Sequence, residues 1–280
     1  MRDDARAMAP GAAHLREAVE FRWRRWGGDL RDAADRLRGR RDPLTPPRRL
    51  LTGDYGHFER LGNEFLVLFK ELGGLKPDDD VLDIGCGPGR MAVPLTGYLS
   101  AAGSYEGFDI VGEEVAWCAA NVTPRFPSFR FQRADVRNSR YNPDGSVPAD
   151  EFRFPYPDES IDFAFATSVF THMLGDEVDR YLAELARVLR PDGRALVTWF
   201  VLNDEARAAL PAGRFRFAVP IGEAFVNDAG SPEVAVAYPE SWIEAHTRAH
   251  GLRVESRHLG TWAGRSGGAS WQDVLILGLA

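Results

Sequence analysis

The chain has 280 residues, of which 44% are apolar, and this is enough to bury the core of one full α/β domain with added elements. Its two cysteines, Cys86 and Cys118, support neither a disulfide framework nor a zinc site, so we expect two plain buried thiols. The net charge of −7 combines +5 in residues 1–50 with −12 in the remainder, and an acidic main body repels phosphate backbones, so we expect no nucleic-acid partner.

Residues 1–50 differ in character from the rest of the chain. They are rich in arginine, and acidic and basic residues alternate around Leu30, Ala34 and Leu37, which is typical of a solvated amphipathic helix. The proline-bearing tract Arg40–Arg49 resembles a linker. We therefore expect an N-terminal helical extension and linker over 1–50 and one domain over 51–280. No apolar signal core or membrane-length apolar run is present, which predicts a cytoplasmic protein with no membrane partner.

From residue 61 the sequence alternates between helix-like and strand-like segments. We expect helices over Leu61–Leu72, Arg90–Leu99, Gly112–Asn121, Asp176–Leu189 and Glu240–His250. We expect strands over Val81–Ile84, Tyr105–Asp109, Phe129–Gln132, Ile161–Ala166, Ala195–Val201, Leu252–Leu259 and Asp273–Leu279. Strands that alternate with helices at this spacing predict a doubly wound, mostly parallel sheet in an α/β fold.

The stretch Val81–Arg90 carries the strongest functional signal. An apolar strand ends there in Asp83 and turns through three alternate glycines, Gly85, Gly87 and Gly89, which leave backbone accessible to a ligand. The dinucleotide-binding pattern fits less well, because its third glycine would fall at Arg90 and Pro88 would disturb the helix start. Asp83 would repel a pyrophosphate but suits an ammonium group. The stretch resembles the first motif of class I S-adenosylmethionine-dependent methyltransferases.

This resemblance covers residues 66–201 closely and implies a fold and a cofactor. The implied fold is a seven-stranded, Rossmann-like sheet that closes with a C-terminal antiparallel hairpin, with an insertion over about 203–238 on the substrate side. The implied cofactor is S-adenosylmethionine, held across the carboxyl ends of the strands. The residues expected to bind it are Asp83, Gly85, Cys86, Gly87, Gly89, Asp109, Ile110, Asp135, Val136 and Ser168.

Two of these residues have specific expected roles. Asp109 follows the second strand, where a carboxylate can accept both ribose hydroxyls, although an N-cap role in the next helix is an open alternative. In the family pattern, Asp135 would accept from the adenine amino group, and the Val136 N–H would face a ring nitrogen.

His172 is the candidate general base for methyl transfer. It follows the fourth strand by a few residues and carries an imidazole that titrates near neutral pH. His57 is the reserve candidate, and a packing role for His172 stays open. We expect no metal, because the fourth strand ends in Thr167 and Ser168 rather than in an acid.

The expected activity is O-methylation of a small-molecule acceptor, of natural-product or sugar-like type. Methylation of carbon or nitrogen on the same fold is an alternative, as is a non-catalytic, cofactor-binding regulatory protein. The only expected partner is the acceptor, and the oligomeric state stays open, with a homodimer among the alternatives.

Overall fold

The computed structural model describes residues 31–32, 34–35, 37–39, 42–51, 54–210 and 215–280, and the chain divides into two compact units, 1–60 and 61–280. In the first unit the guanidinium of Arg48 donates to Asp32 at 2.6 Å and to Asp35 at 2.7 Å, and it lies over the ring of Tyr55. The predicted helical extension falls mainly outside the described residues. Its boundary at residue 50 stays a prediction.

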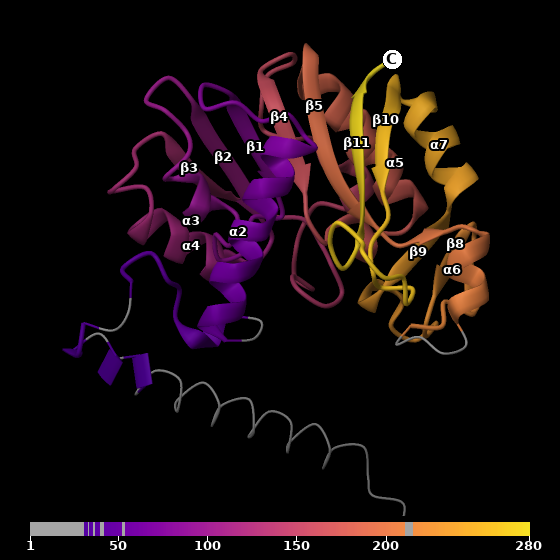
Figure 1. Cartoon of the computed structure of the whole chain (residues 1–280), viewed down its shortest axis with the longest axis horizontal. Helices are drawn as coiled ribbons and strands as arrows, with labels where there is room; N and C mark the ends of the chain where they lie inside the picture. The colour runs from indigo at the N-terminus through magenta and orange to yellow at the C-terminus, as the bar shows by residue number, and fades with distance from the viewer. Residues whose placement is uncertain (1–30, 33, 36, 40–41, 52–53, 211–214) are drawn as a thin grey trace, which may run out of the picture. The chain divides into compact units, whose positions relative to one another are not determined.

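The second unit is built on a seven-stranded sheet (Figure 1). In their order across the sheet the strands are β10 (Leu252–His258), β11 (Asp273–Leu279), β5 (Leu189–Trp199), β4 (Ile161–Ala166), β1 (Asp80–Ile84), β2 (Ser104–Asp109) and β3 (Phe129–Arg133). The pairs from β5 to β3 are parallel, whereas β11 runs antiparallel to both β5 and β10. The predicted doubly wound sheet and its closing antiparallel hairpin are confirmed.

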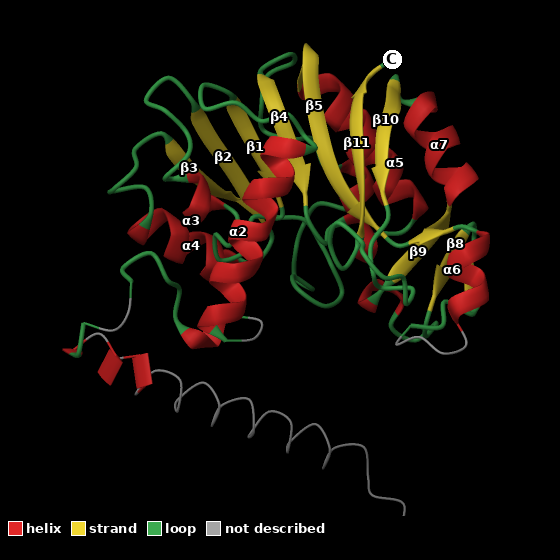
Figure 2. Cartoon of the chain, viewed as in Figure 1, coloured by secondary structure: helices red, strands yellow, loops and turns green. Residues whose placement is uncertain are grey.

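Helices cover both faces of this sheet (Figure 2). They are α2 (Tyr55–Glu71), α3 (Ala92–Leu95), α4 (Gly112–Asn121), α5 (Gly175–Val188) and α7 (Glu240–Ala249). The helix α2 begins earlier than the predicted Leu61, and α3 is shorter than the predicted Arg90–Leu99. Among the described residues, no helix is both long enough and apolar enough to cross a bilayer.

The alternation of side chains along β4 explains why both faces are covered. Phe163 and Phe165 point to one face, where their rings lie 5.6 and 4.3 Å from the ring of Phe69 of α2. Ala164 and Ala166 point to the other face and join the main apolar core with α5. Because both faces of β4 are buried, its sequence is apolar apart from the half-buried Asp162, as in other central parallel strands.

The structure differs from expectation at β5. We predicted a strand over Ala195–Val201, but the strand runs from Leu189 to Trp199. Its pairing with β4 shifts register between Ile161 and Phe163, so residues 190–193 form a bulge within the strand.

The segment predicted as an insertion is more regular than expected. It contributes to a second, four-stranded sheet, in the order β6 (Val201–Leu202), β9 (Val236–Pro239), β8 (Ala224–Val226) and β7 (Val219–Ile221), with helix α6 (Asp204–Ala209) beside it. This sheet follows directly on the carboxyl end of β5. It therefore stands at the edge of the main sheet where ligands bind in open α/β folds.

Candidate active site

The glycine loop after β1 has a backbone that few other residues could adopt. Gly85 has a φ of +78°, and a Cβ atom there would lie 2.6 Å from Cγ2 of Val169. The N–H groups of Gly85 and Cys86 both donate to the carbonyl of Phe108 in β2. This places the loop against the ends of β2 and β4, with its other side turned towards a cavity.

Asp109, at the end of β2, holds this loop in place. Its two carboxylate oxygens each accept a backbone N–H at 2.8 Å, one from Gly87 and one from Val111. Burial raises the pKa of Asp109, and these two hydrogen bonds oppose the rise. The Val111 bond ties the carboxylate to the N-cap residue of α4, but Asp109 is not itself the N-cap, so the N-cap alternative for Asp109 is wrong. Asp109 is therefore already a structural anchor of the loop.

Asp83 is fully buried, and only one of its two carboxylate oxygens has a hydrogen-bond partner. The hydroxyl of Tyr105 donates to its Oδ2 at 2.5 Å, but Oδ1 has no partner among the described residues. Burial raises the pKa of Asp83 to about 8, partly opposed by the bond from Tyr105. The carboxyl is therefore largely protonated near neutral pH until a positive charge approaches it.

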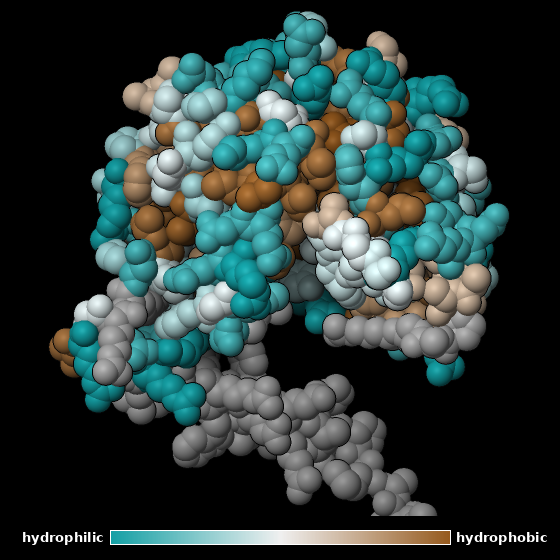
Figure 3. Space-filling model, viewed as in Figure 1, coloured by the Kyte–Doolittle hydropathy of each residue, from teal (hydrophilic) through white to brown (hydrophobic). Residues whose placement is uncertain are grey.

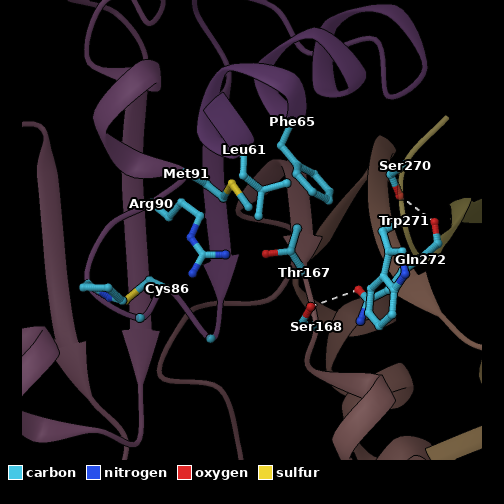
Figure 4. Close-up of a pocket in the computed structure, with 13 residues that line it drawn as sticks. Leu61, Phe65, Cys86, Arg90, Met91, Thr167, Ser168, Ser270, Trp271 and Gln272 are labelled. Carbon is cyan, nitrogen blue, oxygen red and sulfur yellow. Dashed lines mark hydrogen bonds between the residues drawn. The ribbon is translucent and has the colours of Figure 1, made fainter. Parts of the chain in front are cut away.

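A cavity of about 200 Å³ opens beside the glycine loop (Figure 4). It is lined by α2, by the loop after β1, by the end of β4 and by the residues just before β11. The lining residues are Leu61, Phe65, Gly85, Cys86, Gly87, Pro88, Arg90, Met91, Thr167, Ser168, Ser270, Trp271 and Gln272. The viewed face of the molecule shows apolar side chains gathered in its central part and hydrophilic ones around them (Figure 3).

Arg90 brings a positive charge to this cavity. Its Nε is buried and donates to no described group, and the side chain makes no ion pair within hydrogen-bond distance among the described residues. Burial lowers its pKa and Glu114 opposes that shift, but a guanidinium stays charged at any working pH. An anionic ligand group would satisfy it.

Three strands meet at Ser168 on the opposite side of the cavity. Its N–H donates to Oγ1 of Thr198 in β5 at 2.7 Å, and its hydroxyl donates to Oε1 of Gln272 at 2.9 Å (Figure 4). The amide of Gln272 in turn donates to Thr171. Ser168 has a φ of +58°, which is uncommon for a residue with a side chain, and these bonds hold it there.

The predicted cofactor-binding residues are only partly brought together. Gly85, Cys86, Gly87 and Ser168 line the cavity. The other predicted residues are not part of its lining, namely Asp83, Gly89, Asp109, Ile110, Asp135 and Val136. The side chain of Asp135 is 53% exposed and accepts from Ser146, and the backbone of Val136 is buried with its side chain. Their expected contacts with an adenine stay predictions.

His172 lies outside the cavity lining. Its Nδ1–H donates to the carbonyl of Glu233 at 2.8 Å, and Tyr141 meets its ring edge-on. Burial lowers the pKa of His172, so the ring is neutral near pH 7. A general base must reach the proton that it removes, and the base role of His172 stays an untested prediction. His57 lies in unit 1–60 and is equally untested.

Several cavity residues were not predicted as site residues, namely Leu61, Phe65, Pro88, Arg90, Met91, Thr167, Ser270, Trp271 and Gln272. Arg90 could have been found, because it directly follows the glycine loop. Nothing in the sequence singles out Trp271 among the many aromatic residues of the C-terminal third, and Gln272 gives no signal, since both lie some 180 residues further along the chain and reach the cavity only through the sheet order.

Residues 82–197 match the family model described as a methyltransferase domain. This match and the relatives below support a class I S-adenosylmethionine-dependent methyltransferase domain over these residues. The chain is 29% identical to the 27-O-demethylrifamycin SV methyltransferase of Amycolatopsis mediterranei over 187 residues, which cover 65% of this chain and 57% of that protein. It spans between 30% and 59% of the length of the first three curated relatives that it matches.

Two solved structures share its fold. The PH0226 protein from Pyrococcus horikoshii has a TM-score of 0.54 at 14% identity, over 81% of this chain and 93% of its own. The second is the 1,6-didemethyltoxoflavin-N1-methyltransferase of Burkholderia thailandensis, which was solved with 1,6-didemethyltoxoflavin and S-adenosylhomocysteine. Its TM-score is 0.50 at 18% identity, and the match covers 98% of this chain and 91% of that protein. At these identities the likeness concerns the fold alone.

Two side chains near the glycine loop have the charges that the amino-acid end of S-adenosylmethionine calls for. That end carries an ammonium and a carboxylate, while Asp83 has a buried carboxylate oxygen without a partner and Arg90 has a buried Nε without a partner among the described residues. Among the described residues no group of three metal-ligating side chains is assembled. Metal independence stays a prediction, to be checked by adding a chelator during turnover.

Proposed function

We propose that this methyltransferase transfers a methyl group from S-adenosylmethionine to a hydroxyl oxygen of a small-molecule acceptor. The observation that carries the proposal is the cavity, where glycine-loop backbone and Arg90 face the hydroxyls of Thr167, Ser168 and Ser270. The hydroxyls of Ser168 and Ser270 already donate to Gln272, so each can accept a hydrogen bond from an acceptor hydroxyl. The Amycolatopsis relative, named for a 27-O-demethyl substrate, supports oxygen as the methylated atom and a natural product as the acceptor class.

The cofactor would be held at both of its ends. Asp83 would accept from the ammonium, and Arg90 would donate to the carboxylate. Asp109 uses one lone pair of each oxygen for Gly87 and Val111, so each oxygen keeps a second lone pair for a ribose hydroxyl. Cys86 and Ile110 would pack beside the cofactor, and Asp135 and Val136 would contact the adenine.

The protein's part in the reaction is mainly orientation. S-adenosylmethionine supplies an electrophilic methyl group on a sulfonium. The residues of the chain would fix the acceptor oxygen in line with that group, and the apolar wall of Leu61, Phe65 and Met91 would exclude competing water. No side chain that titrates near neutral pH lines the cavity, so the acceptor hydroxyl would need to be acidic or to pass its proton to solvent.

Two measurements test this function. Calorimetry should show S-adenosylhomocysteine binding in the micromolar range, and tighter binding of a nicotinamide dinucleotide would contradict the proposal. Incubation of candidate acceptors with a cofactor labelled in its methyl group should then yield a labelled methyl ether, identified by mass spectrometry and NMR. A labelled N-methyl or C-methyl product would replace the oxygen assignment, and cofactor binding without turnover of any acceptor would favour a regulatory role.

The remaining expectations concern the protein as a whole. We propose a cytoplasmic protein that takes no nucleic acid, and a homodimer is the oligomeric state to test first. Size-exclusion chromatography with light scattering measures that state directly, and a monomeric mass at micromolar concentration would contradict the homodimer.

A further inference from the structure

The segment between β10 and β11 lines part of the cavity, and none of the proposed cofactor contacts involves its residues. Ser270, Trp271 and Gln272 line the cavity from this segment, on the other side of Thr167 from Arg90 (Figure 4). Trp271 belongs to the small group of large apolar side chains that are exposed among the described residues, with 46% of its surface accessible. Such exposure of an indole beside a cavity needs a reason.

The indole of Trp271 is supported from behind by other rings. Its centroid lies 5.4 Å from that of Phe200 and 5.8 Å from that of Phe215, in an edge-on and a tilted arrangement. Phe200 is itself buried in a second apolar cluster together with Phe217 and Trp262. One part of the indole is therefore packed on the protein, and the remainder is free to meet a ligand.

The backbone around Trp271 is held firmly. Gln272 is buried and bonded to Ser168 and Thr171. The next residue, Asp273, is fully buried and accepts from the N–H of Val201, from the N–H of Gly260 and from the indole N–H of Trp262. An exposed aromatic ring on such a fixed support loses little conformational entropy when a ligand packs on it.

The rest of the cavity defines what kind of ligand would fit. Leu61, Phe65 and Met91 make an apolar wall, and the groups near Trp271 are the neutral polar side chains of Thr167 and Ser168. A flat, unsaturated ring would stack on the indole with apolar contact on its other side. A hydroxyl on that ring would reach the polar groups.

We propose that Trp271 is the acceptor-binding face of this methyltransferase and selects a planar, uncharged ring system that carries a hydroxyl. The inference rests on the proposed function, since it names the acceptor class for that same site. In this arrangement Gln272 and Asp273 are positioning residues, which hold the indole beside the end of β4.

A pair of probes with the same carbon skeleton tests the selection. Naphthol is planar and decahydronaphthol is not, and each carries one hydroxyl. With S-adenosylhomocysteine at saturation, calorimetry should show naphthol binding to the wild-type protein about tenfold more tightly than decahydronaphthol. Equal affinities, or no binding of naphthol, would overturn the inference.

Variants then assign the effect to the indole. Trp271→Ala and Trp271→Leu should each weaken naphthol binding about tenfold, while Trp271→Phe keeps most of it, since stacking requires a ring. The leucine variant preserves apolar bulk against Phe200 in case the alanine variant is poorly folded. Tyr141→Ala is the matched control, because Tyr141 is 43% exposed and lies outside the cavity lining.

Measurements of cofactor binding distinguish a failure of the proposed function from a failure of the inference about Trp271. All Trp271 variants should bind S-adenosylhomocysteine like the wild-type protein. If the wild-type protein does not bind S-adenosylhomocysteine, the proposed function fails. If it binds while Trp271→Leu leaves naphthol affinity unchanged, only the acceptor inference fails.

Discussion

The two sides of the cavity are built in different ways. On the β1–β2 side the backbone itself forms the wall, through a loop of glycines that Asp109 ties down within 22 residues of sequence. On the β4–β5–β11 side the wall consists of side chains, and its key bond joins Ser168 to Gln272 across 104 residues. A backbone wall tolerates almost no substitution, whereas a side-chain wall can change without loss of the fold. The first side therefore suits an invariant ligand, and the second suits an acceptor that differs between enzymes.

The strongest test of the backbone wall is Gly85→Ala. An alanine at a φ of +78° is strained, and its Cβ would overlap Val169 at 2.6 Å, so the loop must move. We expect S-adenosylhomocysteine affinity to fall about 100-fold, since a displacement of the order of 1 Å has effects of that size. Calorimetry measures the change.

Gly251→Ala is the matched control for that variant. Gly251 has nearly the same φ, +75°, but a Cβ there would have nothing within 4 Å. It should lose stability by about 1 kcal/mol without any change in cofactor affinity. If both variants bind the cofactor like the wild type, the backbone of the loop is not part of the site.

This difference between the two sides also decides what the sequence could predict. The segment of β4, helix α4 and strand β11 were predicted to the residue, because burial on both faces or a clear helical period marks them locally. The glycine loop was predicted because its φ angles allow few residues other than glycine. Trp271 and Gln272 were missed as site residues because only the antiparallel return of β11 beside β5 brings them to the cavity.

The next largest effect is expected at Arg90. Arg90→Met keeps the length of the stem but removes the unpaired charge, so the cofactor's carboxylate would lose its partner. We expect about tenfold weaker binding of S-adenosylhomocysteine. Methylthioadenosine has no amino-acid end, and its affinity should be the same for both proteins. An equal loss for both ligands would show that Arg90 shapes the loop rather than binding a carboxylate.

Asp83→Asn should make the protein more stable at alkaline pH. An aspartate in the unfolded chain titrates near pH ~3.9, whereas burial raises the pKa of Asp83 in the folded chain to about 8. Between these values the folded state binds more protons, so the stability of the wild type falls as the pH rises, and the amide has no proton to lose. At about pH 8.5 the variant should unfold about 2–4 °C higher, and the gap should shrink towards about pH 5.

Calorimetry measures both the control for Asp83→Asn and the loss of cofactor affinity that should accompany its gain in stability. Asp192→Asn, at an exposed position in the β5 bulge, should leave the unfolding temperature unchanged. Asp83→Asn should bind S-adenosylhomocysteine more weakly and methylthioadenosine normally, since only the former carries an ammonium. A variant that is less stable than the wild type at every pH would show that burial of the ionised Asp83 carboxylate does not destabilise the folded state.

The smallest effect is expected for His172→Gln, which probes the residues that follow β4 outside the cavity lining. A positioned general base is worth about 10²–10⁴ in kcat. In the structure, however, the Nδ1–H of His172 is bound to the carbonyl of Glu233 and the residue does not line the cavity. Glutamine can donate to the same carbonyl through its amide, so we expect kcat to fall by less than about tenfold, with an unchanged pH profile. A fall of 10² or more, together with loss of the acidic limb of the kcat/KM profile, would instead establish His172 as the base and show that the end of β4 rearranges when the acceptor binds.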